Sequence, residues 1–305
     1  MSAGLRHSLF VYDSDAEYAA RLGAFFAEGI DGGDAVCAVM TRAHQSMLED
    51  ELGAASAEMT FMDPVVQYTR AEAALAVFDR ELRRIMGAGA QRIRIFGELP
   101  FDLRQPGPRG HWISYEAILT RAFEHYPLQL VCGYDSRTTP AALMEDLERT
   151  HPEVVTDKAR PSARYTDSAE VLRALASPPR AVPELPLFEL GDDVRAVRVA
   201  LASAMARAGI PAAAARDGLV AVDELLANAR RHAGGVRELR AGRVGERFVV
   251  ALSDDGAGHD DPLAGYLPPR PGGLAGAGLW VARQLSADLE LLSSPRGLTA
   301  RLWIQ

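Results

Sequence analysis

The chain has 305 residues, of which 48% are hydrophobic, so it is long enough for two domains that each bury a core. No apolar run reaches the roughly 18 residues that span a bilayer, and residues 1–7 lack the apolar segment of a signal peptide. We therefore expect a cytoplasmic protein that has no membrane partner. Residues 1–150 hold 14 basic and 22 acidic side chains, a net charge of −8, which argues against direct nucleic-acid binding there.

The first 150 residues alternate predicted strands with predicted helices. Apolar runs predict strands at 8–12, 35–40, 59–62, 93–96 and 128–132. Helical patterns fill the intervals at 16–29, 43–52, 69–87, 112–125 and 140–149. This alternation predicts an α/β domain with a doubly wound parallel sheet, buried on both faces by helices.

The two cysteines, Cys37 and Cys132, both lie inside these apolar runs. We expect buried thiols at both positions, and neither a disulfide nor a metal site.

Polar side chains follow the predicted strands at Asp13, Thr41, Asp63, Glu98 and Asp135. Ligands of open α/β sheets bind at the carboxyl ends of the strands, which makes this edge a candidate site. For the three aspartates, a role in a turn or a helix cap is the preferred interpretation.

A P-loop is missing from this first domain, because the pattern Gly-x-x-x-x-Gly-Lys-[Ser/Thr] does not occur. The single lysine of the chain, Lys158, lies beyond residue 150. We therefore expect no phosphoryl transfer in the first domain.

Several segments of the first domain resemble the MEDS sensory domain, a RecA/KaiC-related module of regulators such as DcmR. They are residues 7–13, 96–100, 112–116, 130–135 and 150–152, and the resemblance covers about residues 5–153. It implies a RecA/KaiC-like sheet and a sensor of small molecules, such as hydrocarbon derivatives. It also implies a sensory pocket formed by His7, Tyr12, Glu98, Tyr115, Glu116 and Tyr134. Alternatively, Tyr12 and Tyr134 are half-buried strand aromatics, and His151 simply ends a helix.

Prolines and few large apolar residues mark the stretch that follows. We expect a semi-stiff linker at 154–186, with a short helix at 168–175. It would join a sensory domain at 1–153 to a second domain at 187–305.

The second domain carries predicted helices at 192–208, 212–232 and 277–286, and predicted strands at 236–242, 246–254, 288–293 and 298–304. A Pro/Gly-rich segment at 258–275 is expected to form a short lid. The helix at 212–232 places Glu224, Asn228 and His232 on one stripe, because positions four apart are neighbours on a helix. An Asn carbonyl is a hard oxygen ligand for Mg²⁺, and a nearby Glu can act as a base.

This stripe and the glycine-rich segments after it resemble the ATP-binding (GHKL) domain of histidine kinases, gyrase-type ATPases and anti-sigma-factor serine kinases. The N-box is matched by residues 224–233, and the first glycine box by Asp254, Gly256 and Gly258. The second glycine box is matched by residues 272–280, and the closing strand by Gly297-Leu298-Thr299. The resemblance implies a Bergerat-type α/β sandwich that binds ATP with Mg²⁺.

The same resemblance implies a role for each residue. Glu224 would be the catalytic base, and Asn228 would bind Mg²⁺ within an N-box that includes His232. The adenine amine would be bound by Asp254, and Gly256 and Gly258 would let the backbone pass close to the base. The remaining nucleotide contacts would come from Gly276 and Gly278 at the phosphates and from Thr299 at the adenine edge.

Two kinds of GHKL protein fit the sequence poorly. A histidine autokinase needs a phospho-accepting His on a dimerisation hairpin, whereas His151 precedes a proline, His125 precedes Tyr126 and His232 lies in the N-box. A gyrase-type ATPase needs a downstream domain with a catalytic lysine, whereas the sequence ends at Gln305, directly after the last predicted strand.

The remaining resemblance is to the RsbW/SpoIIAB class of anti-sigma serine/threonine kinases. It implies a sigma factor or an anti-anti-sigma (STAS) protein as partner, control of transcription, and a small-molecule ligand for the first domain; a homodimer is left open. Members of that class usually stand alone, so the fused sensor is a departure. A non-catalytic ATP-binding adaptor and an ATPase without a protein substrate are the alternatives.

Overall fold

The computed structural model describes residues 4–305, except 69, 100–108, 157, 190–193 and 271–275, and only the backbone of residues 72 and 109–111. The chain divides into two compact units, Met1–Leu175 and Ala176–Gln305, which are described separately. Within the described residues, no helix is both long and apolar enough to cross a membrane.

A mainly parallel sheet forms the centre of the first unit. Its strands are β1 (Arg6–Tyr12), β2 (Ala35–Val39), β3 (Thr60–Met62), β4 (Ile93–Glu98), β5 (Leu128–Asp135), β6 (Glu153–Val155) and β7 (Ala159–Pro161). They run in the order β3-β2-β4-β5-β1-β6-β7, and only the β6–β7 pair is antiparallel. The predicted α/β class is therefore confirmed. The short β6 and β7 were not predicted.

The helices of this unit are α1 (Asp15–Asp31), α2 (Arg42–Leu52), α3 (Pro64–Gln67), α4 (Ala71–Gly87), α5 (Arg109–Phe123), α6 (Ala141–Thr150) and α7 (Ser168–Leu175), with a 3-10 helix at Gly53–Glu58. Side chains of Ser14, Thr41 and Asp63 accept hydrogen bonds from backbone N–H groups at the starts of α1, α2 and α3. Asp135 accepts from the backbone N–H of Arg137 in a turn. Asp63 therefore caps a helix and Asp135 stabilises a turn, as the preferred interpretation of these aspartates predicted.

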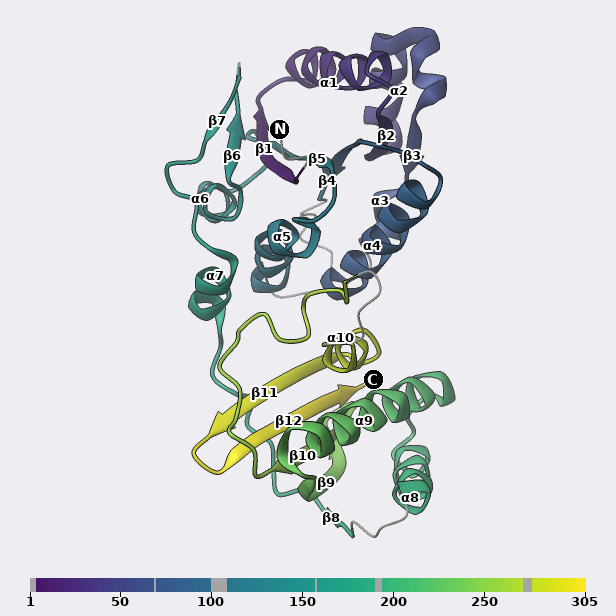
Figure 1. Ribbon diagram of the computed structural model, residues 1–305, viewed down its shortest axis with the longest axis vertical. Helices are drawn as coiled ribbons and strands as arrows, with labels where there is room; N and C mark the ends of the chain where they lie inside the picture. The colour runs from purple at the N-terminus through teal and green to yellow at the C-terminus, as the bar shows by residue number, and fades with distance from the viewer. Residues whose placement is uncertain (1–3, 69, 100–108, 157, 190–193, 271–275) are drawn as a thin grey trace. The chain divides into compact units, whose positions relative to one another are not determined.

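Helices cover both faces of this sheet, which is why β1, β2, β4 and β5 are buried along most of their length. On one face, Phe10 and Phe96 pack against Tyr18 and Phe26 of α1. The other face lies against α4 and α5, and Figure 1 shows these helices opposite α1 and α2. The first unit is doubly wound.

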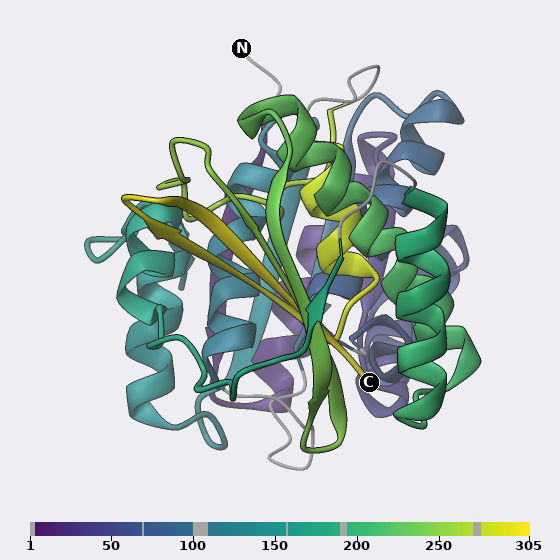
Figure 2. The same ribbon diagram turned by 90° about the horizontal axis from the view of Figure 1, so that it is seen from below.

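An antiparallel sheet forms the second unit. Its strands are β8 (Leu187–Phe188), β9 (Val236–Val244), β10 (Arg247–Asp254), β11 (Asp288–Ser294) and β12 (Gly297–Ile304), in the order β11-β12-β10-β9-β8. Its helices are α8 (Val194–Arg207), α9 (Ala212–Ala233) and α10 (Ala277–Gln284). All three pack on one face, as Figure 2 shows from below. This two-layer arrangement is the α/β sandwich that was expected.

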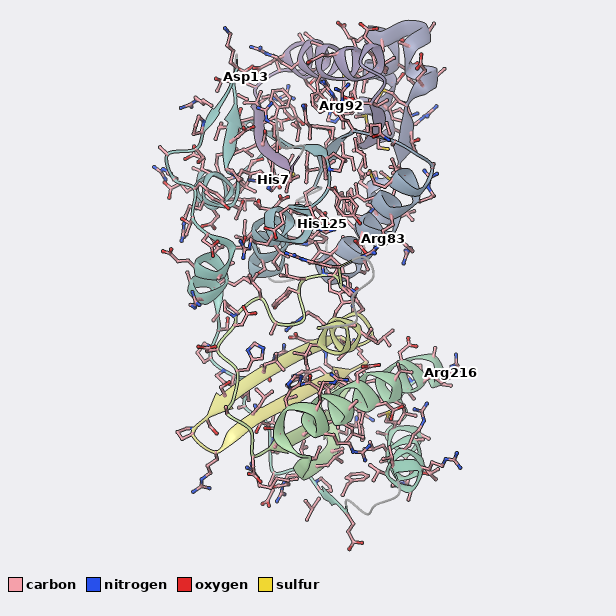
Figure 3. The ribbon with its side chains drawn as sticks, viewed as in Figure 1. His7, Asp13, Arg83, Arg92, His125 and Arg216 are labelled. Atoms are coloured by element: carbon pink, nitrogen blue, oxygen red, sulfur yellow. The ribbon has the colours of Figure 1, made fainter. Side chains whose placement is uncertain are left out.

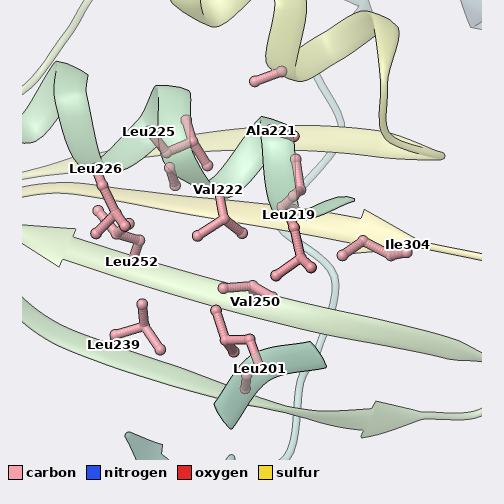
Figure 4. Close-up of a cluster of buried hydrophobic side chains, with 14 of the residues drawn as sticks. Leu201, Leu219, Ala221, Val222, Leu225, Leu226, Leu239, Val250, Leu252 and Ile304 are labelled. Carbon is pink, nitrogen blue, oxygen red and sulfur yellow. The ribbon is translucent and has the colours of Figure 1, made fainter. Parts of the chain in front are cut away.

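The long helix α9 is amphipathic, and its apolar face supplies the core. Leu219, Val222 and Leu226 lie over Val250 and Leu252 of β10 (Figure 4). Each of these side chains is at most 8% exposed. The stripe that carries the N-box is left on another face of the helix.

The segment that was expected to be a linker contributes to both units. Strands β6 and β7 and helix α7 pack in the first unit, and α7 has the expected bounds. Leu185 packs against Val249 and Trp303 on the second sheet, on the face away from the helices. The guanidinium of Arg180 stacks 4.5 Å from the Trp303 ring and lies 3.2 Å from the Glu290 carboxylate.

Candidate nucleotide-binding site

Helix α9 positions the N-box side chains one turn apart. Glu224 and Asn228 are half-buried, and His232 is exposed in the last turn, ahead of the left-handed cap at Gly234. This placement suits groups that meet a ligand, because full burial would desolvate the carboxylate at a large cost.

The start of α10 approaches α9 closely at one glycine. A Cβ atom built at Gly278 would lie 2.9 Å from Oε2 of Glu224, so the absent side chain makes room for this carboxylate. Gly276 caps α10 with φ of 78°, a conformation that favours glycine. The first N–H groups of a helix have no partner within the helix and can bind phosphate, and phosphate binding by this segment stays a prediction. Residues 272–275 of the second glycine box lie outside the described residues.

Asp254 is buried at the end of β10, after an irregularity in the pairing with β9. Its Oδ1 accepts hydrogen bonds from the backbone N–H of Gly256, at 2.9 Å, and of Leu298, at 3.2 Å. These two bonds orient the carboxylate and join the first glycine box to β12.

Gly297 allows this junction to form. It has φ of 118°, and a Cβ atom there would lie 2.0 Å from the carbonyl oxygen of Asp254. The Gly-x-Thr pattern was the sequence signal for this residue, although its packing role was not predicted. Thr299 lies two residues further along β12, with its Oγ1 2.8 Å from Oγ of Ser253.

The first glycine box packs against the end of α9. A Cβ atom at Gly256 would lie 3.0 Å from Cβ of Ala233, and Gly258 adopts φ of 81° beside Ser293. Contacts at Gly278, Gly256 and the strand pair β10–β12 therefore connect the N-box helix to the other predicted motifs. The individual roles of these residues stay predictions.

The described part of the predicted lid packs on α10 through Arg283, which sequence reasoning missed. Arg283 is 5% exposed, donates to the carbonyl oxygens of Ala264 and Leu289, and stacks 3.8 Å from the Tyr266 ring centre. A Cβ atom at Gly265 would lie 2.9 Å from the carbonyl oxygen of Leu279. The sequence did contain a signal for this role, because Arg283 lies on the apolar side of α10 together with Leu279 and Trp280.

In the first unit, the predicted pocket residues fall into two groups. Buried near α5 are His7, Tyr115, Glu116 and Tyr134, and the Tyr134 hydroxyl donates to Oε1 of Glu116 at 2.5 Å. Tyr115 and Glu116 border an enclosed cavity of about 10 Å³, which has room for one water molecule.

The second group lies at the carboxyl ends of β1 and β4, where Tyr12 and Glu98 lie near His44 of α2. Nδ1 of His44 is 2.5 Å from Oε1 of Glu98, and this hydrogen bond raises the pKa of His44 above its usual value. Burial, followed by the charge of Glu98, raises the pKa of Tyr12. His44 was not predicted. Tyr12 and Tyr134 are 4% and 3% exposed, so their description as half-buried was wrong.

The two units match two known families. Residues 189–304 match the histidine kinase-like ATPase domain, and residues 6–152 match the MEDS family, the "MEthanogen/methylotroph, DcmR Sensory domain". The chain therefore combines an N-terminal MEDS sensory domain with a C-terminal histidine kinase-like ATPase domain. This combination supports ATP-binding signalling. None of the curated proteins compared with the chain matches it.

Proposed function

We propose that this protein is a ligand-regulated serine/threonine kinase and anti-sigma factor, which binds Mg-ATP and controls transcription by switching partners. The observation that carries the proposal is the placement of Glu224. Its carboxylate is half-buried on the N-box stripe, and Gly278 at the start of α10 leaves space for it. A base there can act on the hydroxyl group of a protein substrate, or on a water molecule, that attacks the terminal phosphate.

The neighbouring groups suit Mg-ATP. Oδ1 of Asp254 already accepts hydrogen bonds from two backbone N–H groups. Its other carboxylate oxygen, Oδ2, would accept a hydrogen bond from the adenine amine. Asn228, one turn from Glu224, offers a carbonyl oxygen to Mg²⁺. Free N–H groups at the start of α10 would bind phosphate oxygens. Magnesium, when bound, neutralises phosphate charge during transfer.

A non-catalytic adaptor, in which ATP only orders the lid and a binding face, is the second candidate. Arg283 and Gly265 pack the described part of the lid against α10. This contact favours the adaptor, because ATP could order the lid through it. An adaptor has no use for a base at position 224, and we therefore prefer the kinase. A plain ATPase would show turnover that is independent of any partner.

Regulation would come from the first unit, which has no P-loop lysine and offers buried polar groups instead. A small molecule there controls the kinase only if it binds two states of the protein with different affinity. The unit boundary places the cut for a truncation after Leu175. Removing residues 1–175 should change sigma-factor binding or partner phosphorylation, while ATP affinity stays within several-fold.

The decisive experiment measures phosphate transfer from labelled ATP to a STAS protein encoded beside this chain. Glu224→Gln should lower the transfer rate by roughly 10²–10⁴-fold and retain ATP binding, because a base acts on the nucleophile. Asp223→Asn is the matched control, since Asp223 precedes Glu224 and is paired with Arg198. Transfer at the wild-type rate by Glu224→Gln would exclude the base. ATP-dependent sigma binding without any transfer by the wild type would favour the adaptor.

A further inference from the structure

A cluster of potential metal ligands lies in the core of the first unit. It consists of His7 on β1, Cys132 on β5, Glu116 on α5 and His151 directly after α6, and Figure 3 labels His7. One donor atom from each side chain lies within 4.8 Å of all the others. The four residues are between 0% and 5% exposed, which separates this cluster from the acidic groups that are common on surfaces.

The topology explains why residues so far apart in sequence meet. Strands β1 and β5 are parallel neighbours, with His7 opposite Leu130 and Leu9 opposite Cys132. The His7 and Cys132 side chains therefore point to the same face of the sheet, towards α5. Glu116 lies on α5, and His151 precedes β6, which pairs with β1 on its other side.

Hydrogen bonds determine which atom of His151 faces the cluster. Nδ1 lies 2.8 Å from the carbonyl oxygen of Leu147, which can only accept, so Nδ1 carries the proton. Nε2 then has a bare lone pair. It lies 3.3 Å from Oε2 of Glu116, and neither of these buried atoms has a hydrogen-bond partner. Two unsatisfied acceptors side by side are costly unless a proton or a cation lies between them.

His7 is arranged in the same way. Its Nδ1 is 2.9 Å from Oγ1 of Thr120, while Nε2 lies 3.4 Å from Sγ of Cys132 and 3.8 Å from Oε2 of Glu116. A neutral imidazole whose second nitrogen is held from outside is the form in which histidine binds metals.

We propose that His7, Glu116, Cys132 and His151 bind a divalent transition-metal ion, with Zn²⁺ the best match to the donor set. In a tetrahedral zinc site with bonds of about 2.0–2.3 Å, the donor atoms are roughly 3.3–3.8 Å apart. Three of the six separations between donor atoms, 3.3, 3.4 and 3.8 Å, fall within this range, and all six are at most 4.8 Å. A thiolate and a carboxylate together cancel the charge of the ion, as burial requires.

With four protein ligands the site is closed, which is typical of structural zinc. The ion would join β1, β5, α5 and the end of α6, and the Tyr134 hydroxyl would orient Glu116 from outside. This proposal is independent of kinase activity, and it replaces the expectation that Cys132 is only a buried thiol. Cys37 is buried outside the cluster and is still described as a buried free thiol.

The test uses the full-length chain, purified without chelators. Elemental analysis should find one zinc per chain, or one Zn²⁺ should bind in competition with a chromophoric chelator. Co²⁺ in its place should show tetrahedral d–d bands and a thiolate-to-cobalt charge-transfer band. Substoichiometric binding of both ions, or a Co²⁺ spectrum without the thiolate band, would overturn the proposal. A proton shared by Glu116 and His151 would then explain the contact.

Variants separate this site from adventitious binding. Cys132→Ser and His151→Gln should weaken Zn²⁺ binding by at least about 100-fold, since changes outside the ligand shell alone cost about 10–100-fold. Cys37→Ser and His125→Gln are the controls, because each removes the same kind of side chain elsewhere in the unit, and both should bind like the wild type. Equal Zn²⁺ affinity in Cys132→Ser and the wild type would also overturn the proposal. Circular dichroism of each metal-free variant checks that it is folded.

Discussion

Replacing Asp254 with asparagine should change nucleotide recognition without unfolding the second unit. Oδ1 of Asp254 accepts from the backbone N–H groups of Gly256 and Leu298. In the Asp254→Asn variant the carboxamide oxygen can keep both bonds, so the NH₂ group must occupy the position of the other carboxylate oxygen. That position is the one that would face the adenine amine, where a donor would then meet a donor.

The expected magnitude follows from this exchange. A hydrogen bond to a charged group contributes about 1.5–3 kcal/mol, so the affinity for Mg-ATP should fall roughly 10- to 100-fold. Inosine triphosphate carries a carbonyl oxygen in place of the amine and can accept from the new NH₂ group. Asp254→Asn should therefore lose ATP affinity and gain relative affinity for inosine triphosphate, while its unfolding free energy stays within about 1 kcal/mol of the wild type.

Isothermal titration with both nucleotides, in the presence of Mg²⁺, measures this change. Asp255→Asn is the control, because Asp255 is exposed and paired with Arg237. Asp254→Ala provides a second comparison, since it leaves two backbone N–H groups without their acceptor and should unfold more easily. If Asp254→Asn binds both nucleotides as the wild type does, the carboxylate does not contact the base and the adenine assignment fails.

Three further predictions concern other contacts. Asn228→Ala should abolish the dependence of ATP binding on Mg²⁺, which titrations with and without the ion would detect. Gly297→Ala should lower the unfolding free energy by at least about 2 kcal/mol more than the control Gly245→Ala does. Both glycines have positive φ, but of the two only position 297 lacks space for a Cβ atom. Urea denaturation measures the difference. The raised pKa of His44 means that its pair with Glu98 stabilises the fold below the unfolded-state pKa of about 6.5, and that this stability is lost as pH rises through the folded-state pKa. The stability difference between wild type and His44→Gln should shrink accordingly in urea titrations over that pH range.

The motifs of the second unit could be predicted because their geometry is local. Glu224 and Asn228 share a stripe through helical spacing alone, and the glycine boxes each lie within a few residues of chain. What the sequence could not supply is the contact between motifs. That Gly278 meets Glu224, or that Gly297 meets the carbonyl oxygen of Asp254, depends on how helices and strands pack, and no spacing along the chain encodes those distances.

Element boundaries were predicted to within about three residues where apolar runs are long. The predictions missed β6, β7 and β8, which have two or three residues each and too little apolar pattern to show periodicity. Proline content suggested a linker around Leu185, yet this side chain is buried against Trp303. A proline-rich stretch can still pack, because proline limits backbone conformation and does not prevent its neighbours from burying apolar surface.

The metal-ligand cluster shows the limit of reading pattern from sequence most clearly. Cys132 was expected to be only a buried thiol because it lies in an apolar run, and the alternative interpretation of His151 was that it simply ends a helix. Both expectations used neighbours in the chain, whereas the chemistry of each residue is set by neighbours in space that lie on β1, α5 and the end of α6. In a parallel sheet, strands that are far apart in the sequence can be neighbours. Here the strand order β5-β1-β6 places Cys132, His7 and His151 beside one another. Strand order therefore decides whether these side chains are separate core residues or one site, and it is the property that short-range pattern does not contain.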